Sequence, residues 1–201
     1  LNLIWKINLV INFNCNKNLL LSYSLERVFQ IKQTIKSSIA LGQLIDSLSM
    51  AFQKNIPLEE AIAPEARDQA FGRRSSIEEK GSNKGIFSHS QNEKIKNRRL
   101  YNREITDKDG NGCLDKMMGN CFAVFSKGNI KNKLDRGIYE KLINLNFKFI
   151  FDFKYLNISS ELLEYLEQGE IIIRPDKKIY GLSSTELDIN ELARELLLQI
   201  Q

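Results

Sequence analysis

The feature that most constrains the fold of this chain is a long apolar stripe near its start. From Leu19 onward, apolar residues recur at steps of three and four, which is the spacing of one face of an α-helix. The stripe predicts one continuous helix of about nine turns, too long to be covered by the residues before it, so part of it should be exposed. It consists of Val28, Ile31, Ile35, Ile39, Gly42, Ile45, Leu48 and Phe52.

A shorter apolar stretch, residues 1–13, precedes the stripe and has the same helical spacing. It is too short to span a bilayer and carries Lys6, so we expect no membrane association. It also lacks the basic start and cleavage site of a signal peptide. Because the chain does not begin with Met, we expect it to be part of something longer.

The hydrophobic period changes after about residue 97. Residues 131–146 and 159–168 look helical, and Asp188 opens a last helix with a capping-box pattern ending at Glu191. Short β-branched or aromatic runs bounded by turns predict strands at 121–125, 147–153, 170–175 and 178–182. This order of elements is that of a small α/β layer fold.

These patterns divide the chain into a helical part, residues 1–71, a linker, residues 72–96, and an α/β domain, residues 97–201. The linker is rich in Gly, Ser, Asn and charged residues. We therefore expect proteolysis between residues 72 and 97 to leave a resistant C-terminal piece. Residues from about 97 onward should also fold readily alone.

Charge gives little indication of a nucleic-acid partner. The 201 residues are 42% hydrophobic and 27% charged, with a net charge of +4, which is ordinary for a globular protein. Basic residues concentrate in residues 66–104, including KIKNRR at 94–99. The run lacks interleaved aromatic residues, so a solvated loop is favoured and no nucleic-acid binding is expected.

The stretch DKDGNGCLDKMM, residues 107–118, begins like an EF-hand calcium loop. Such a loop needs a bidentate Glu at its twelfth position, and this position is Met118. Asp-Gly and Asn-Gly instead favour a tight turn, because they supply residues that adopt positive φ. The sequence therefore predicts a turn and no calcium site.

No catalytic, cofactor-binding or metal-binding residue can be assigned from motifs. Cys15, Cys113 and Cys121 form no CxxC and, with His89, no zinc set. Three cysteines without a disulfide framework favour the reducing cytoplasm, and the spacing of Cys113 and Cys121 argues against redox activity. A glycine-rich phosphate loop, a Ser-His-Asp set and HExxH are all missing from the sequence.

Two stretches at the start nevertheless resemble a known family. NLIWKINLVINF (2–13) and LLLSYSLERVFQIKQTIKSSIALGQLI (19–45) are similar to the region after the second flavin motif of FAD-dependent aromatic hydroxylases, the phenol and hydroxyphenylpropionate hydroxylase type. The family patterns there are NLxWKLxxVL and LLDSYExERRPVA. The matching residues are Asn2, Leu3, Trp5, Lys6, Leu20, Ser22, Tyr23, Glu26 and Arg27.

Two further stretches fall in the family's order. NRRLYNREITDKDGNGCLDKMMGNCFAVF (97–125) resembles the segment that enters the family's C-terminal domain. Its matches are Leu100, Tyr101, Asp109, Gly110, Leu114, Asp115, Gly119, Phe122 and Ala123. IIIRPDKKIYG (171–181) resembles the last hairpin of the thioredoxin-like domain of these enzymes.

The resemblance implies an enzyme that binds FAD, uses NADH or NADPH and hydroxylates a phenolic substrate. The family's GxGxxG fold, GD motif and glycine-rich flavin turn are absent from these residues. The chain then represents the helical end of the FAD domain plus a thioredoxin-like domain without CxxC, inactive alone. The alternative is a non-catalytic, thioredoxin-like interaction or dimerisation module. Its partner would be a second copy of the chain, with which it would form a homodimer.

Several conspicuous residues have simpler structural interpretations. Trp5 is expected in a core, because it lies on an apolar helix. Glu26 and Arg27 favour an ion pair or cap at a helix crossing. The sequence Arg174-Pro175-Asp176 could form an anion site, but a hairpin turn explains it more simply. His89 lies in a polar loop, where it should be solvated.

Overall fold

The computed structural model describes residues 1–57, 85–89, 95, 98–151 and 153–201. The chain forms two compact units. The first joins Leu1–Tyr23 to Lys84–Gln201, and the second is Ser24–Asn83. Each unit is described by itself.

The predicted N-terminal helices are both present. Helix α1 spans Asn2–Asn12, the 3-10 helix η1 spans Lys17–Leu20, and α2 spans Leu21–Lys54. The intervening asparagines end one helix and begin the next. Asn14 has a φ of 53°, and the side chain of Asn16 accepts a hydrogen bond from the N–H of Asn18, which caps η1.

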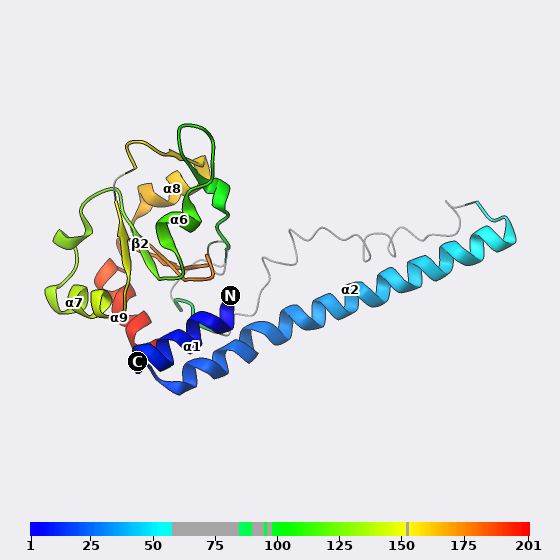
Figure 1. Ribbon diagram of the computed structural model, residues 1–201, viewed down its shortest axis with the longest axis horizontal. Coiled ribbons are helices and arrows are strands. Elements are labelled where there is room, and N and C mark those ends of the chain that lie inside the picture. The colour runs from blue at the N-terminus through cyan, green and yellow to red at the C-terminus, as the bar shows by residue number, and fades with distance from the viewer. Residues whose placement is uncertain (58–84, 90–94, 96–97, 152) are drawn as a thin grey trace. The chain divides into compact units, whose positions relative to one another are not determined.

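A four-stranded sheet forms the centre of the first unit, with the strand order β3-β2-β5-β6 (Figure 1). Strands β2 and β3 are parallel, whereas β2–β5 and β5–β6 are antiparallel. All four strands lie inside stretches that the sequence predicts as strands. They are β2 (Ala123–Phe125), β3 (Lys148–Ile150), β5 (Ile171–Ile173) and β6 (Ile179–Leu182).

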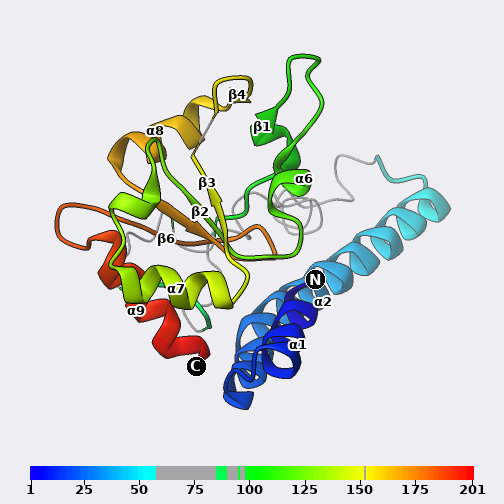
Figure 2. The same ribbon diagram turned by 60° about the vertical axis from the view of Figure 1, so that its left-hand side comes forward.

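Alternating side chains of this sheet enter two separate cores, so the unit has three layers. Val124, Ile172 and Tyr180 pack with residues of α1, α7 (Arg136–Asn144) and α9 (Ile189–Ile200) on one face (Figure 2). Phe125 and the flanking isoleucines pack with α6 (Leu114–Met118) and α8 (Ser160–Gln168) on the other. The α/β fold class predicted from the sequence is confirmed.

Capping residues determine where two of the helices begin. The Asp188 carboxylate accepts hydrogen bonds from the N–H groups of Asn190 and Glu191, as the capping-box pattern predicts. The predicted helix over 131–146 is shorter than expected. It divides into η3 (Ile130–Asn132) and α7, because Asp135 adopts an extended conformation (ψ 137°) as the N-cap of α7.

Three short elements complete the first unit. The 3-10 helix η2 spans Asn102–Glu104. Strand β1 (Ile105–Thr106) pairs antiparallel with β4 (Asn157–Ile158) in a separate two-stranded sheet. The N–H of Ser159 donates to the carbonyl of Glu104, which holds the start of α8 beside η2.

Helix α1 belongs to the core of the α/β unit. Trp5, Leu9, Cys15 and Leu19 are buried in one cluster with Phe122 and residues of α7 and α9. The N–H of Asn16 also donates to the carbonyl of Ile200, 3.1 Å away. These contacts argue against the expectation that residues from about 97 onward fold readily alone. The assignment of residues 1–71 to a flavin domain stays a prediction.

The segment 72–96, which the sequence predicts as a linker, lies largely outside the described residues. Its described part differs from a linker, because Ile86, Phe87 and Ser88 are buried. The N–H of Ser88 donates to the carbonyl of Tyr180, and its hydroxyl donates to Glu195. Two apolar side chains and these bonds fix the segment against β6 and α9.

In the second unit, α2 has one covered side and one exposed side. Leu44 and Ala51 are buried, whereas Val28, Ile35 and Phe52 are exposed. The expectation that part of the long stripe is exposed is therefore confirmed.

Candidate functional site

A buried ion pair lies in the turn between β5 and β6. The Arg174 side chain is 0% exposed, and its Nε and Nη2 atoms lie 3.0 Å and 2.7 Å from the two carboxylate oxygens of Asp176. Its Nη1 atom donates to the carbonyl of Ile86 at 2.8 Å. This bidentate arrangement is the strong form of an Arg–carboxylate contact, because two charge-assisted bonds fix both groups.

The first helix completes this cluster. The Arg174 guanidinium lies 4.5 Å from the ring centre of Phe87 and 5.3 Å from that of Trp5, within cation–π range. The amide of Asn2 donates to Asp176 at 2.8 Å. The matched residues at the start of the chain therefore contact the matched Arg-Pro-Asp near its end. Local sequence patterns gave no signal of this contact.

The chemistry of the cluster is that of a structural clamp. Burial alone would raise the pKa of Asp176, but the charge and hydrogen bonds of Arg174 and the Asn2 amide outweigh it and hold that pKa below its usual value. With its charge neutralised and its side chain inaccessible, Arg174 cannot receive a soluble anion. The turn interpretation is confirmed, since Lys177 has a φ of 65° and its N–H donates to the Arg174 carbonyl.

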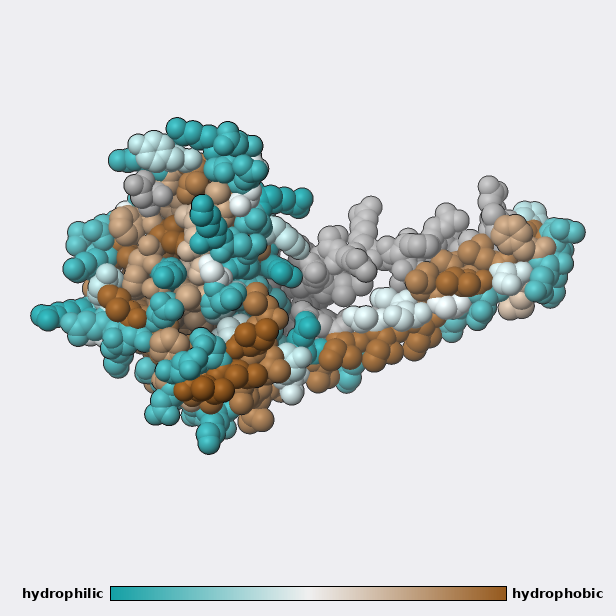
Figure 3. Space-filling model, viewed as in Figure 1, coloured by the Kyte–Doolittle hydropathy of each residue, from teal (hydrophilic) through white to brown (hydrophobic). Residues whose placement is uncertain are grey.

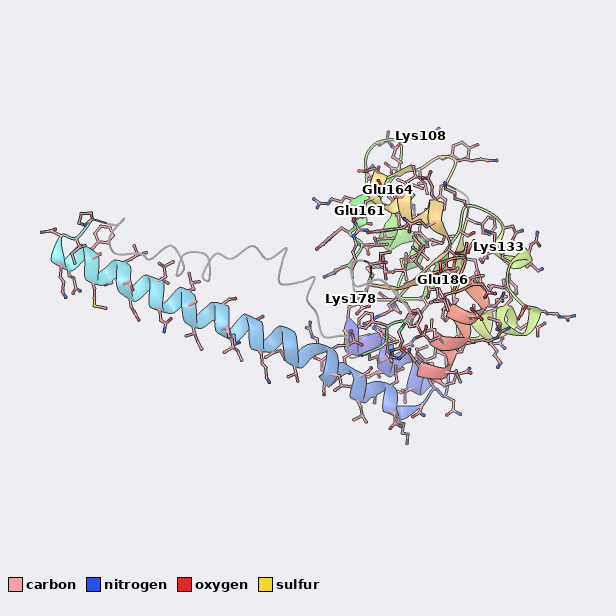
Figure 4. The ribbon with its side chains drawn as sticks, turned by 180° about the vertical axis from the view of Figure 1, so that it is seen from behind. Lys108, Lys133, Glu161, Glu164, Lys178 and Glu186 are labelled. Carbon is pink, nitrogen blue, oxygen red and sulfur yellow. The ribbon has the colours of Figure 1, made fainter. Side chains whose placement is uncertain are left out.

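A polar cavity of about 400 Å³ lies where α8 leads into β5. At its inner side Glu170 accepts hydrogen bonds from Lys133, labelled in Figure 4, and from the hydroxyls of Ser126 and Ser183. Its lining comprises Lys127, Lys133, Leu166, Glu167, Gln168, Gly169, Glu170, Ser183, Ser184 and Thr185. Lys127 pairs with Glu167 at 3.1 Å, so both lysines of the cavity face carboxylates.

Glu170 should make the stability of the unit pH-dependent. Burial opposes its ionisation, but the bonds from Lys133 and Ser183 prevail and lower its pKa below the usual value. The unfolded chain then takes up a proton at higher pH than the folded protein. The contribution of Glu170 is thus complete above about pH 5 and is lost as the pH falls through its lowered pKa.

We therefore expect Glu170→Gln to be less stable than the wild type at pH 7 and to converge with it in acid. Urea unfolding between about pH 7 and pH 3, followed by the fluorescence of Trp5, measures this difference. Glu167→Gln is the matched control, because the Lys127–Glu167 pair is exposed and should contribute little. If the free energies of unfolding of the wild type and Glu170→Gln differed by the same amount at every pH, Glu170 would not be the source of this pH dependence.

The residues of the calcium-like stretch form a turn. The Asp107 carboxylate accepts hydrogen bonds from the N–H groups of Asp109 and Asn111, and Gly110 has a φ of 82°. The N–H of Asn111 is the main cause of a lowered pKa for Asp107. The turn prediction is confirmed. Within the described part of the chain, no group of three or more metal-ligating side chains comes together.

The cysteines and His89 do not form a shared site. All three cysteines are free; Cys15 is buried, which raises the pKa of its thiol, and Cys113 and Cys121 are half-buried. The His89 side chain is exposed, as expected. Glu26 is buried and Arg27 is exposed, and the ion pair or cap predicted for them stays a prediction.

Much of the basic run at 94–99 lies outside the described residues. Arg98 is described, and its guanidinium pairs with Glu104 at 3.2 Å and with Glu161 at 2.5 Å. Figure 4 shows Glu161 beside Glu164 on α8. The charge of Arg98 is therefore compensated within the unit. No described helix combines the length and the hydrophobicity needed to cross a membrane.

The described residues do not fit a flavin dinucleotide. The polar cavity presents the Glu170 and Glu167 carboxylates, which would repel a pyrophosphate. The glycine that lines this cavity leaves no open cradle, because a Cβ at Gly169 would lie 2.2 Å from the Ser183 carbonyl oxygen. No step of flavin chemistry can be placed on these residues.

Comparison with known proteins finds a solved structure with a similar fold. No family model matches the chain, and no curated protein matches it. Among solved structures, the fold is shared with a flavin-containing biosynthetic enzyme. That enzyme is the rebeccamycin biosynthetic enzyme RebC, solved with reduced flavin; the match has 14% sequence identity, a TM-score of 0.59 and 98% coverage of this chain. It spans 39% of the RebC chain.

The chain has an α/β fold like that of part of a flavin-containing enzyme.

Proposed function

We propose that this chain is the C-terminal portion of an FAD-dependent, NAD(P)H-using monooxygenase that hydroxylates a phenolic substrate. The observation that carries the proposal is that 98% of the chain matches 39% of a flavin-containing enzyme. The ordered residue matches to aromatic hydroxylases add the reaction and substrate class. When bound, the flavin would supply the oxygen chemistry, and the protein would hold and orient it.

The role of the described residues in such an enzyme is structural. The proposal includes a thioredoxin-like domain without CxxC at residues 97–201, which the strand–helix–strand order of β2, α7 and β3 and the β5–β6 hairpin support. The Arg174 clamp ties the end of this domain to α1. Flavin binding is then assigned to polypeptide outside these 201 residues.

A binding comparison tests the proposal. The reading frame upstream of the Leu1 codon should encode a GD motif and, further back, GxGxxG, and the longer protein should purify with stoichiometric FAD. The 201-residue chain should form no such complex, because its sequence lacks the GxGxxG motif whose backbone N–H groups hold a pyrophosphate. An upstream frame without these motifs would refute the proposal, and tight FAD binding by the chain alone would refute the assignment of its site.

A second candidate function is a non-catalytic interaction module. It is favoured by the exposed apolar residues of α2, which need a partner in any soluble assembly. Binding of FAD by the longer protein separates the two candidates, since an interaction module requires no flavin.

A further inference from the structure

We draw no further inference here: the strongest candidate, the exposed apolar side of helix α2 (Figure 3), carries no proposal, because nothing in the described part of the chain shows what covers it.

Discussion

Replacing Trp5 by alanine is expected to lower the free energy of unfolding of the α/β unit by about 3–5 kcal/mol. Trp5 is 2% exposed and meets the Phe122 ring edge-on, with ring centres 5.3 Å apart. The Arg174 guanidinium lies over the same indole. The substitution therefore removes the largest apolar surface that α1 buries, an aromatic contact and a cation–π contact.

Urea unfolding followed by far-ultraviolet circular dichroism measures this loss, because Trp5 is the single tryptophan and its variant has no indole signal. Ile4→Ala is the matched control. Ile4 is the neighbouring residue of the same helix and is 62% exposed, so its change should stay within about 0.5 kcal/mol. If the two variants were equally stable, α1 would not be part of the core of this unit.

The strands and helices of the first unit could be predicted because their signals are local. The apolar run Ile171–Ile173 is bounded by Gly169 and Pro175, and the central strand β2 is likewise a short apolar stretch between turns. Asp188 fixes the start of α9 through its own side chain. The helix over 131–146 was predicted too long, because the conformation of Asp135 interrupts it while the apolar spacing continues.

The position of α1 could not be predicted, because it depends on distant residues. Apolar spacing shows that residues 1–13 form a helix, but it does not identify the surface that covers Trp5 and Leu9. Trp5 and Leu9 are buried by Phe122 and by residues of α7 and α9, which are more than a hundred residues away in the sequence. The burial of Phe87 escaped prediction for the same reason, since its partner is Arg174.

The candidate site was only partly predictable. A turn at Arg174-Pro175-Asp176 follows from Pro and Asp alone. A charged residue directly after three isoleucines is also a signal that its side chain needs a buried partner. Asn2, which completes the cluster, lies 174 residues before Asp176. The resemblance to one family matched both stretches, residues 2–13 and 171–181, to one kind of protein. It did not predict that the two stretches are in contact.

Replacing Arg174 by methionine is expected to cost about 3–5 kcal/mol of stability. The change keeps much of the side-chain volume but leaves the Asp176 carboxylate buried without its counter-charge. It also leaves the Ile86 carbonyl without its 2.8 Å donor. The double variant Arg174→Met/Asp176→Asn should recover at least half of the loss, because no buried charge remains and an asparagine oxygen can still accept from Asn2.

Chemical unfolding of these variants measures the coupling between the two side chains. Arg136→Met is the control: Arg136 pairs with Glu140 at 2.9 Å, but its side chain is 92% exposed. Such pairs contribute at most about 1 kcal/mol, since water and salt screen the charges. A loss for Arg174→Met no larger than that of the control would mean that the pair is solvated in solution. The connection of α1 to the β5–β6 turn would then rest on the Trp5 ring alone.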